Sequence, residues 1–359
     1  MSKSNYYGVI LAGGRGTRFW PRSRRSRAKQ VLNFLGERSL IQQTMDRLAP
    51  VIPPEHIWIL TNGHLRDEIV SQLPEVPEPQ ILAEPAQRNT APCLGLAAQI
   101  LHSQDENAVM GVFPADHLIV QQEAYQRLLE PAFRAAEEGK IGVIGIQPRW
   151  PETGYGYIEF EEGVQPGLPQ AVPVKSFHEK PKKEVAEKYV AAGNFYWNAG
   201  MFFWKTAVLL DALRKYQPKT SQLLASLPRF GSEEFEAHLA EAFPRCENIS
   251  IDHAVLEKAV NVAGVPAGDI GWSDVGSWNA VYELMPRDEC GNAKASEALV
   301  QASTGNYVDA RGKLVALLGV NDLIVVDTPD ALLIADRNRA QDVGSLVKAL
   351  EEMKRDEFL

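Results

Sequence analysis

Continuous apolar runs alternate with longer amphipathic stretches over the first 146 residues, and this alternation restricts the fold more than any other feature of the sequence. The apolar runs lie at 6–11, 56–60, 80–84, 108–113 and 141–146. Helix-like stretches separate most of them, at 39–48, 64–73, from 90 onward and at 122–138. Strands that are apolar at every position are buried on both faces, as in a parallel sheet covered by helices. We therefore expect a doubly wound α/β sheet, with its ligand at the carboxyl ends of the strands.

The pattern changes twice after residue 146. From 147 to 288, strand-like segments such as GYGYIEFE mix with helical stretches at 183–192 and 232–242, which we interpret as antiparallel additions to the same sheet. From 289 to 359, short strands with turn signals precede a helix near 341–353, a pattern typical of a small β-solenoid. The sequence thus predicts a first domain at 1–288 and a small C-terminal β-domain at 289–359.

The overall charge and the cysteines limit the partners and the compartment. A net charge of −9 and an isoelectric point near 5.4 disfavour extended contact with nucleic acid or an anionic membrane. Cys93, Cys246 and Cys290 lack metal-ligand spacing and are interpreted as reduced structural thiols. No segment reads as a signal peptide or a membrane span, so we expect a cytoplasmic protein.

A glycine-rich, basic stretch, LAGGRGTRFWPRSRRSRAKQ at 11–30, follows the first apolar run. Gly13, Gly14 and Gly16 allow backbone N–H groups to approach a phosphate closely. No Gly-Lys-Ser/Thr follows, and a dinucleotide fingerprint would need glycine at Phe19. The stretch carries seven basic residues and no acidic ones, which indicates a bound polyanion such as a triphosphate. A solvated basic face is the alternative, and it applies most readily to the side chains of Arg22, Arg24 and Arg25.

The same stretch resembles the N-terminal signature of the sugar-nucleotide pyrophosphorylases, Leu-Ala-Gly-Gly-x-Gly-x-Arg-x-x-Pro followed by a Pro-Lys pair. Here that pair reads Ala28-Lys29, so the lysine is present and the proline is not. The continuation KQVLNFLGERSLIQQTMDRL is similar to the mannose-1-phosphate guanylyltransferases, and later motifs follow in the same order. The resemblance implies a Rossmann-like mixed sheet of the nucleotide-diphospho-sugar transferase type, with nucleotide bound by 1–146 and sugar by 147–288.

For the reaction, the resemblance implies transfer of GMP from GTP to α-D-mannose 1-phosphate, giving GDP-mannose and pyrophosphate. It implies that the glycine-rich loop holds the triphosphate and that Arg18 and Lys29 neutralise its charge. The loop residues concerned are Leu11, Ala12, Gly13, Gly14, Gly16 and Thr17.

The run AEPAQRNTAPC at 83–93 ends one expected strand and opens a helix. We expect Thr90 to cap that helix while Glu84, Arg88 and Asn89 present side chains above the sheet edge. A purely structural turn is the alternative. The resemblance assigns the run to a guanine pocket, where hydrogen-bonding groups discriminate strongly between bases.

Two aspartates are candidate Mg²⁺ ligands, because carboxylate oxygens on this cation offset phosphate charge. Asp116 follows a strand in FPADHLI, and Asp274 lies in WSDVGSW before an expected helix near Ser277. The resemblance matches both to the two metal-binding aspartates of the family, with Asp269 as the competitor for the second position. His117 and His253 are interpreted as structural or supporting residues.

Three short motifs suggest the sugar-phosphate side: TGYGYIE, FHEKP and FYWNAGMFFW. Carboxylate, amide and backbone groups beside aromatic walls suit hydroxyl recognition. The resemblance places Gly156, Glu179 and Asn198 around the sugar and Lys180 near its phosphate. Asp252 is either a further sugar ligand or a helix cap.

We expect the sugar phosphate oxygen, already ionised at neutral pH, to attack the α-phosphorus without a general base. A heptose 1-phosphate or a wider range of sugar 1-phosphates is the runner-up substrate, and a non-catalytic subunit that senses GDP-mannose is the alternative from another class. The resemblance implies association through the C-terminal domain, and we expect a monofunctional homodimer.

Overall fold

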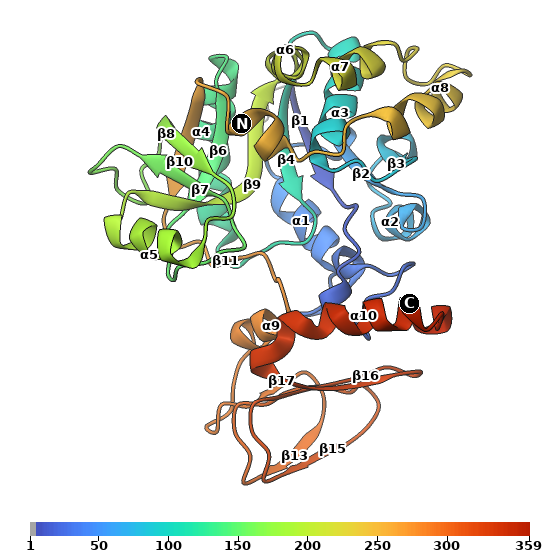
Figure 1. Cartoon of the computed structure of the whole chain (residues 1–359), viewed down its shortest axis with the longest axis vertical. Coiled ribbons are helices and arrows are strands. Elements are labelled where there is room, and N and C mark those ends of the chain that lie inside the picture. Colours follow the sequence, from blue (N-terminus) through green and yellow to red (C-terminus); the bar gives the residue numbers. More distant parts are fainter. Residues whose placement is uncertain (1–4) are drawn as a thin grey trace.

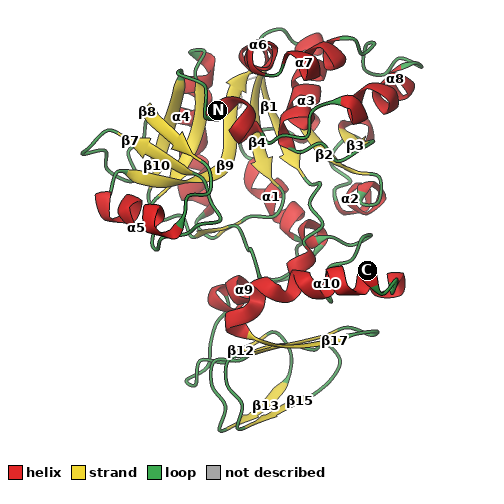
Figure 2. Ribbon diagram, viewed as in Figure 1, coloured by secondary structure: helices red, strands yellow, loops and turns green. Residues whose placement is uncertain are grey.

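The computed structural model describes residues 5–359, and a nine-stranded sheet forms its centre (Figures 1 and 2). The strand order is β3-β2-β1-β4-β9-β6-β10-β8-β7. The strands are β1 (Tyr6–Leu11), β2 (Ile57–Asn62), β3 (Ile81–Glu84), β4 (Val109–Pro114), β6 (Ile141–Ile146), β7 (Tyr157–Phe160), β8 (Val172–His178), β9 (Phe195–Lys205) and β10 (Val262–Ala267). The five strands predicted before residue 146 are all present in this sheet.

The sheet is mixed, as expected. Strands β1 to β4 pair in parallel, whereas β9 runs antiparallel to both β4 and β6 and separates them. Strands β7 and β8 pair antiparallel, which confirms the antiparallel additions. β10 differs from that expectation because it pairs in parallel with β6.

Helices cover both faces of the sheet because neighbouring β-strand residues point to opposite sides. Ile10 packs in the cluster with the helices α1 (Leu40–Leu48), α2 (Arg66–Gln72) and α4 (Gln122–Glu137). Val9 faces the other cluster. That second face carries α3 (Thr90–Gln104), α6 (Thr206–Tyr216), α7 (Pro218–Ala225) and α8 (Phe235–Ala242). The predicted helix at 183–192 is α5 (Lys183–Ala192).

The C-terminal strands coil as the sequence predicts. In the sheet β12-β14-β16-β17, Ala293 pairs in parallel with Tyr307, which pairs in parallel with Ile324. A second parallel pair lies opposite (Figure 1). Asn306 links successive coils, since its amide donates to Asn292 and its carbonyl accepts from the Leu323 N–H. The strands are β12 (Ala293–Lys294), β13 (Ala298–Gln301), β14 (Tyr307–Asp309), β15 (Val315–Leu318), β16 (Leu323–Asp327) and β17 (Leu332–Asp336).

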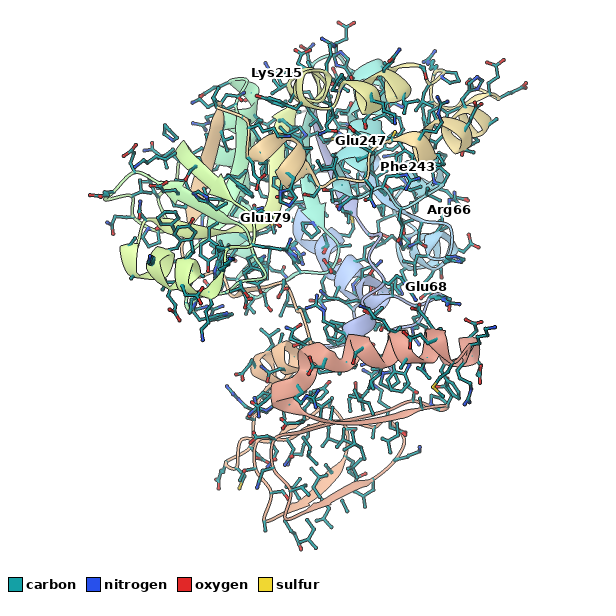
Figure 3. The ribbon with its side chains drawn as sticks, viewed as in Figure 1. Arg66, Glu68, Glu179, Lys215, Phe243 and Glu247 are labelled. Carbon is teal, nitrogen blue, oxygen red and sulfur yellow. The ribbon has the colours of Figure 1, made fainter. Side chains whose placement is uncertain are left out.

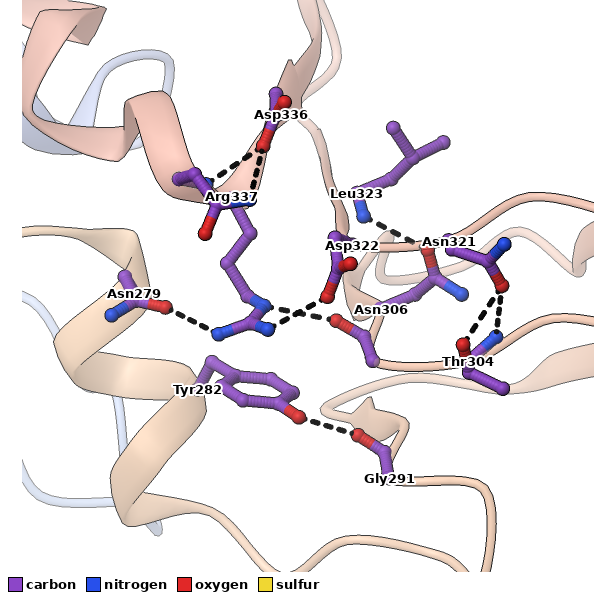
Figure 4. A network of polar contacts seen from close by, with 12 residues as sticks. Asn279, Tyr282, Gly291, Thr304, Asn306, Asn321, Asp322, Leu323, Asp336 and Arg337 are labelled. Carbon is purple, nitrogen blue, oxygen red and sulfur yellow. Dashed lines mark hydrogen bonds and ion pairs between the residues drawn. The ribbon is translucent and has the colours of Figure 1, made fainter.

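Helix α9 (Trp278–Leu284) is fastened to these coils by one arginine (Figure 4). Arg337 donates to Asn279 Oδ1 at 2.8 Å, to Asp322 Oδ1 at 2.7 Å and to the Gly305 carbonyl. Tyr282 donates its hydroxyl to the Gly291 carbonyl. The end of the first domain and the C-terminal coils are therefore joined by side-chain hydrogen bonds as well as by the chain.

The basic stretch lies against the C-terminal domain, beside helix α10 (Val343–Glu352) (Figure 1). Phe19 and Phe34 pack with Trp278 and Tyr307 in one buried cluster. Ion pairs surround this cluster: Arg22 with Asp309, Arg24 with Asp330 and Arg25 with Asp356. The surface interpretation was therefore wrong for Arg22 and Arg24, whose side chains are 10% and 15% exposed and bind carboxylates of the C-terminal domain. Arg25 does lie at the surface, with its side chain 44% exposed, and its ion pair with Asp356 is solvated.

Candidate functional site

A cavity of about 890 Å³ opens at the carboxyl ends of β1, β3 and β4 and extends toward β7 and β9. Most of the predicted site residues line it. On the nucleotide side these are Leu11, Ala12, Gly13, Gly14, Glu84, Asn89, Thr90 and Asp116. On the sugar side they are Gly156, Glu179, Lys180, Asn198, Asp252 and Asp274. Gly16, Thr17, Arg18, Lys29 and Arg88 are not among the residues that line this cavity.

Lys29 lies behind the cavity wall and joins the two candidate metal ligands. Its side chain is 7% exposed, and Nζ donates to Asp116 Oδ2 at 2.9 Å and to the Asp274 carbonyl at 2.5 Å. Burial raises the pKa of Asp116, but the positive charge of Lys29 is the largest of the effects that outweigh burial and lower that pKa. The lysine therefore keeps Asp116 ionised and fixes its distance from the segment of Asp274.

The glycines of the loop serve two different purposes. Gly14 faces open space, so its backbone is accessible to a ligand in the cavity. Gly16 instead adopts a φ of +63°, and a Cβ there would collide with the Cβ of Lys29. Gly16 is thus required by the loop's turn and by its packing on the lysine.

The two arginines nearest the cavity are held by the C-terminal segment. Arg18 donates to Gln341 Oε1 at 2.6 Å, and Arg15 donates to Glu351 Oε1 at 2.8 Å. Arg18 lines a second cavity of about 980 Å³ between the two domains, where Tyr155 and Asp274 form part of the shared wall. Arg15, absent from the predicted set, lines the first cavity.

The predicted base pocket differs in detail from expectation. Asn89, and not Thr90, caps α3, because its Oδ1 accepts from the Thr90 N–H at 2.9 Å. Thr90 Oγ1 instead accepts from the Ile251 N–H. The Arg88 guanidinium donates to the Pro244 carbonyl, and so fastens the loop to a distant segment.

Glu84 brings an unusual carboxyl group to this pocket. Its Oε1 is buried and has no hydrogen-bond partner among the described residues. Burial raises the pKa of Glu84 to about 7, although the neighbouring Cys93 thiol offsets part of that rise. The group can accept hydrogen bonds from a ligand, or donate one when it is protonated.

On the sugar side, four predicted residues lie together (Glu179 is labelled in Figure 3). Asn198 donates through Nδ2 to Asp252 Oδ1 at 3.1 Å, and its backbone N–H donates to the Gly156 carbonyl. A Cβ on Gly156 would come within 2.6 Å of Glu179 Oε2. Asp252 does not cap a helix; burial, with the Glu179 charge second, raises its pKa to about 6. This cluster of carboxylates and amides suits a polyhydroxylated ligand.

Sequence reasoning missed Tyr155 and Gln30. The Tyr155 hydroxyl donates to Asp274 Oδ1 at 2.7 Å, and burial raises its pKa, so it stays a donor. Gln30 Nε2 donates to the Ala12 carbonyl at 2.6 Å, and this hydrogen bond fixes the start of the glycine-rich loop. Tyr155 lies inside the motif TGYGYIE, so its position was available from the sequence; the contact with Asp274, 119 residues away, was not.

The competing candidates occupy supporting positions. Asp269 accepts from the Gly271 N–H and lines neither cavity. His117 lines the first cavity, but burial lowers its pKa to about 4, and its ring lies against Trp272. His253 is exposed and bonds Glu257.

Asp116 and Asp274 fit a cation that completes its shell with substrate oxygens. No group of three His, Cys, Asp or Glu side chains suited to a metal occurs among residues 5–359. The two carboxylates line one cavity, and Lys29 and Tyr155 bond only one oxygen of each. Mg²⁺ is typically bound by one or two carboxylates together with water and phosphate.

Family models match two parts of the chain. The "Nucleotidyl transferase" model matches residues 7–290, and a "MannoseP isomerase/GMP-like beta-helix domain" matches residues 298–350. Within residues 5–359, no helix has the length and apolar character needed to cross a membrane.

Curated relatives match nearly the whole chain. Mannose-1-phosphate guanylyltransferase of Klebsiella pneumoniae is 38% identical over 98% of this chain and 75% of its own length. The Escherichia coli K12 protein of that name is 39% identical, over 98% of this chain and 74% of its own length. Alginate biosynthesis protein AlgA of Pseudomonas aeruginosa is also 39% identical, over 97% and 73%.

A solved structure has the same fold throughout. The Thermus thermophilus protein described as mannose-1-phosphate geranyltransferase superposes with a TM-score of 0.86 at 33% identity, over 97% of this chain and 99% of that one. The match to the family model, the near-complete alignment with these relatives and the cavity at the strand ends agree: the chain belongs to the nucleotidyl transferase family and is a nucleotidyltransferase.

Proposed function

We propose that the protein is a mannose-1-phosphate guanylyltransferase, which transfers GMP from GTP to α-D-mannose 1-phosphate and releases pyrophosphate. One observation carries the proposal. A single cavity is lined by Glu84 and Asn89, by the open glycine backbone at Gly14, and by the cluster of carboxylates and amides around Glu179. The relatives that align over 97–98% of the chain carry the same activity in their names or act in the synthesis of a polysaccharide.

Each region of the cavity has a role in this reaction. Glu84 and Asn89 offer acceptors and a donor to guanine, and the backbone at Gly13 and Gly14 borders the phosphates. Glu179, Asn198 and Asp252 bind mannose hydroxyl groups, and Lys180 lies near the sugar phosphate. The ionised phosphate oxygen attacks the α-phosphorus, so the protein contributes positioning and charge stabilisation.

Asp116 and Asp274 would hold Mg²⁺, which when bound offsets phosphate charge. Lys29 keeps Asp116 ionised, and Tyr155 orients Asp274. Arg18 lines the neighbouring cavity and donates to Gln341. When a bound phosphate replaces Gln341 as its hydrogen-bond partner, Arg18 adds positive charge near the phosphates.

Pyrophosphate release tests the proposal directly. The enzyme is incubated with Mg²⁺ and each of four nucleoside triphosphates, against mannose, glucose and heptose 1-phosphates. Release with GTP and mannose 1-phosphate supports the proposal, and Asp116→Ala should abolish it while the fold survives. Preferential release with heptose 1-phosphate would establish the runner-up substrate. Saturable binding of GDP-mannose without release from any pair would indicate a sensing subunit.

We also propose that the protein forms a homodimer through its C-terminal coils. Several large apolar side chains are exposed there: Leu299, Leu314, Leu318, Leu332 and Ile334 are 53–74% exposed. Leu299 and Leu318 lie on the paired strands β13 and β15, and Leu332 and Ile334 lie on β17 at the edge of the other sheet. Exposed apolar area of this kind is typical of an association surface. Light scattering should give twice the chain mass of 39.8 kDa, and Leu318→Glu should shift it toward the monomer. The cytoplasmic location stays a prediction from the sequence.

A further inference from the structure

Arg15 lies in the variable position of the glycine-rich loop, between Gly14 and Gly16, and it borders two spaces. It lines the first cavity described above, which holds the candidate active site and is called the active cavity below. It also lines a small cleft against α10, together with Val347. Of the seven basic residues at 15–29, Arg15 alone lines the active cavity. Arg15 is therefore the basic residue of the loop that borders the cavity itself.

In the structure this guanidinium is engaged by a carboxylate from the far end of the chain. Arg15 Nη2 lies 2.8 Å from Glu351 Oε1 on α10, and the two side chains are 41% and 33% exposed. Glu351 also lies 3.8 Å from Arg25. The hydrogen bond from Arg15 and the charges of both arginines lower the pKa of Glu351, so it is anionic at neutral pH.

The helix that carries Glu351 packs directly on the loop. A Cβ on Gly344 of α10 would lie 3.4 Å from Thr17 Oγ1 and 3.6 Å from Arg18 Cγ. Arg18, by contrast with Arg15, is held by the neutral amide of Gln341. A phosphate that approaches the loop therefore competes with an anion for Arg15 but not for Arg18.

We infer that Arg15 is a further triphosphate-binding residue and that Glu351 is a positioning residue which holds it until the triphosphate displaces the carboxylate. The inference rests on the proposed function, since it takes a nucleoside triphosphate as the ligand. An exposed ion pair is weak, so the competition changes nucleotide affinity by about fivefold or less. Through this ion pair, the C-terminal domain lowers the affinity of the glycine-rich loop for the nucleoside triphosphate.

A double-mutant cycle tests this inference. Calorimetry with GTP and Mg²⁺ is performed on the full chain and on Arg15→Gln, Glu351→Gln and the double variant. Glu351→Gln should tighten GTP binding about two- to fivefold and lower KM for GTP without changing kcat. Arg15→Gln should weaken binding, and adding Glu351→Gln to it should restore nothing.

The matched control is Asp356→Asn. Asp356 pairs with Arg25 at 2.8 Å, on the same loop and from the same end of the chain, but neither lines the active cavity. It should leave GTP affinity unchanged. Thermal unfolding of each variant checks that the fold is retained.

Three results would overturn the inference. They are an unchanged or weakened affinity in Glu351→Gln, an equal gain in Asp356→Asn, and a gain that persists when Arg15 is already glutamine, which would indicate a long-range charge effect. A wild-type protein that binds no GTP would contradict the proposed function itself. GTP binding with no coupling in the cycle would contradict only the role of Arg15 and Glu351.

Discussion

Lys29 is a buried amine whose two partners are the segments that carry the candidate metal ligands. Replacing it with alanine leaves Asp116 without its nearest opposite charge and frees the Asp274 carbonyl. We expect Lys29→Ala to lower the rate of pyrophosphate release at least tenfold. Lys140→Ala, which removes an exposed lysine paired with Glu138, should leave that rate unchanged. A near-normal rate in Lys29→Ala would remove the lysine from the catalytic site.

The carboxyl of Glu84 predicts how stability depends on pH. Burial raises its pKa to about 7 from the ordinary value of 4.5. Between these two values the folded protein keeps the proton that the unfolded chain loses, so the free energy of unfolding falls as pH rises. Above about pH 7, Glu84 is ionised in both the folded and the unfolded state. The full free-energy cost of burying its charge then lowers the stability of the folded protein.

Glu84→Gln removes this titration. We expect the difference in the free energy of unfolding, variant minus wild type, to increase between pH 5 and pH 8, by about 2 kcal/mol at most. Urea unfolding at both pH values measures the difference, and Glu37→Gln at an exposed position is the control. A constant difference across that range would contradict the raised pKa.

Single site residues were predictable where position alone decides the contact. Gly14, Asp116 and Asn198 line the cavity because they follow or lie on strands whose ends meet there. Arg18 and Arg88 were harder, since their long side chains turn toward Gln341 and Pro244. Those partners lie 323 and 156 residues away, and no local pattern encodes such a distance.

At the scale of elements, the turn before α3 combines strain with function. Asn89 has φ of 63° and ψ of −173°, a conformation that is essentially restricted to glycine and costs about 1–3 kcal/mol in other residues. Its side chain caps α3 and lines the cavity. Strain at such a site is typical of a residue retained for binding.

Two substitutions of Asn89 separate these contributions. Asn89→Gly relieves the strain and loses only a few tenths of a kcal/mol of capping, so it should stabilise the protein by about 1 kcal/mol. Asn89→Ala keeps the strain and loses the cap, so it should destabilise the protein by about 1 kcal/mol. Both should weaken GTP binding equally, as measured by calorimetry. Unchanged affinity in both variants would exclude the amide from the nucleotide site.

The strands of the first 146 residues were predictable because each is a continuous apolar run. The position of β9 was not. It inserts between β4 and β6 and runs antiparallel to both. The pairing with β4 spans about 90 residues of chain, and such distant pairings are not encoded locally. The apolar pattern of a segment predicts that it forms a strand. Which strands it pairs with depends on the packing of the complete sheet.

At the scale of the whole molecule, the basic stretch connects the two domains as well as bordering the cavity. The stretch as a whole was expected to bind a polyanion, with a solvated basic face as the alternative for Arg22, Arg24 and Arg25. These three arginines instead pair with carboxylates of the C-terminal domain. A cluster of basic residues predicts anionic partners, but charge composition does not distinguish a ligand from carboxylates of the same chain.

The Arg22–Asp309 pair predicts that the two domains unfold together. The side chains are 10% and 2% exposed and lie 2.7 Å apart. Arg22→Ala therefore leaves the buried Asp309 carboxylate with only the exposed Arg311, 3.5 Å away, as a cationic partner. We expect a loss of about 3 kcal/mol in the free energy of unfolding, against less than about 1 kcal/mol for Arg38→Ala, whose partner Asp46 is exposed. Tryptophan fluorescence, to which Trp278 at the interface contributes together with six other tryptophans, and circular dichroism should give one coincident urea transition.

The double variant Arg22→Met with Asp309→Leu should recover most of that loss, because apolar side chains of similar volume replace a buried pair at little cost. Recovery with a single transition would assign the effect to the uncompensated charge in a continuous interface. Two separate transitions in the wild type would instead mean that the C-terminal domain unfolds alone, and the ion pairs around Phe19 and Trp278 would then contribute little to its docking.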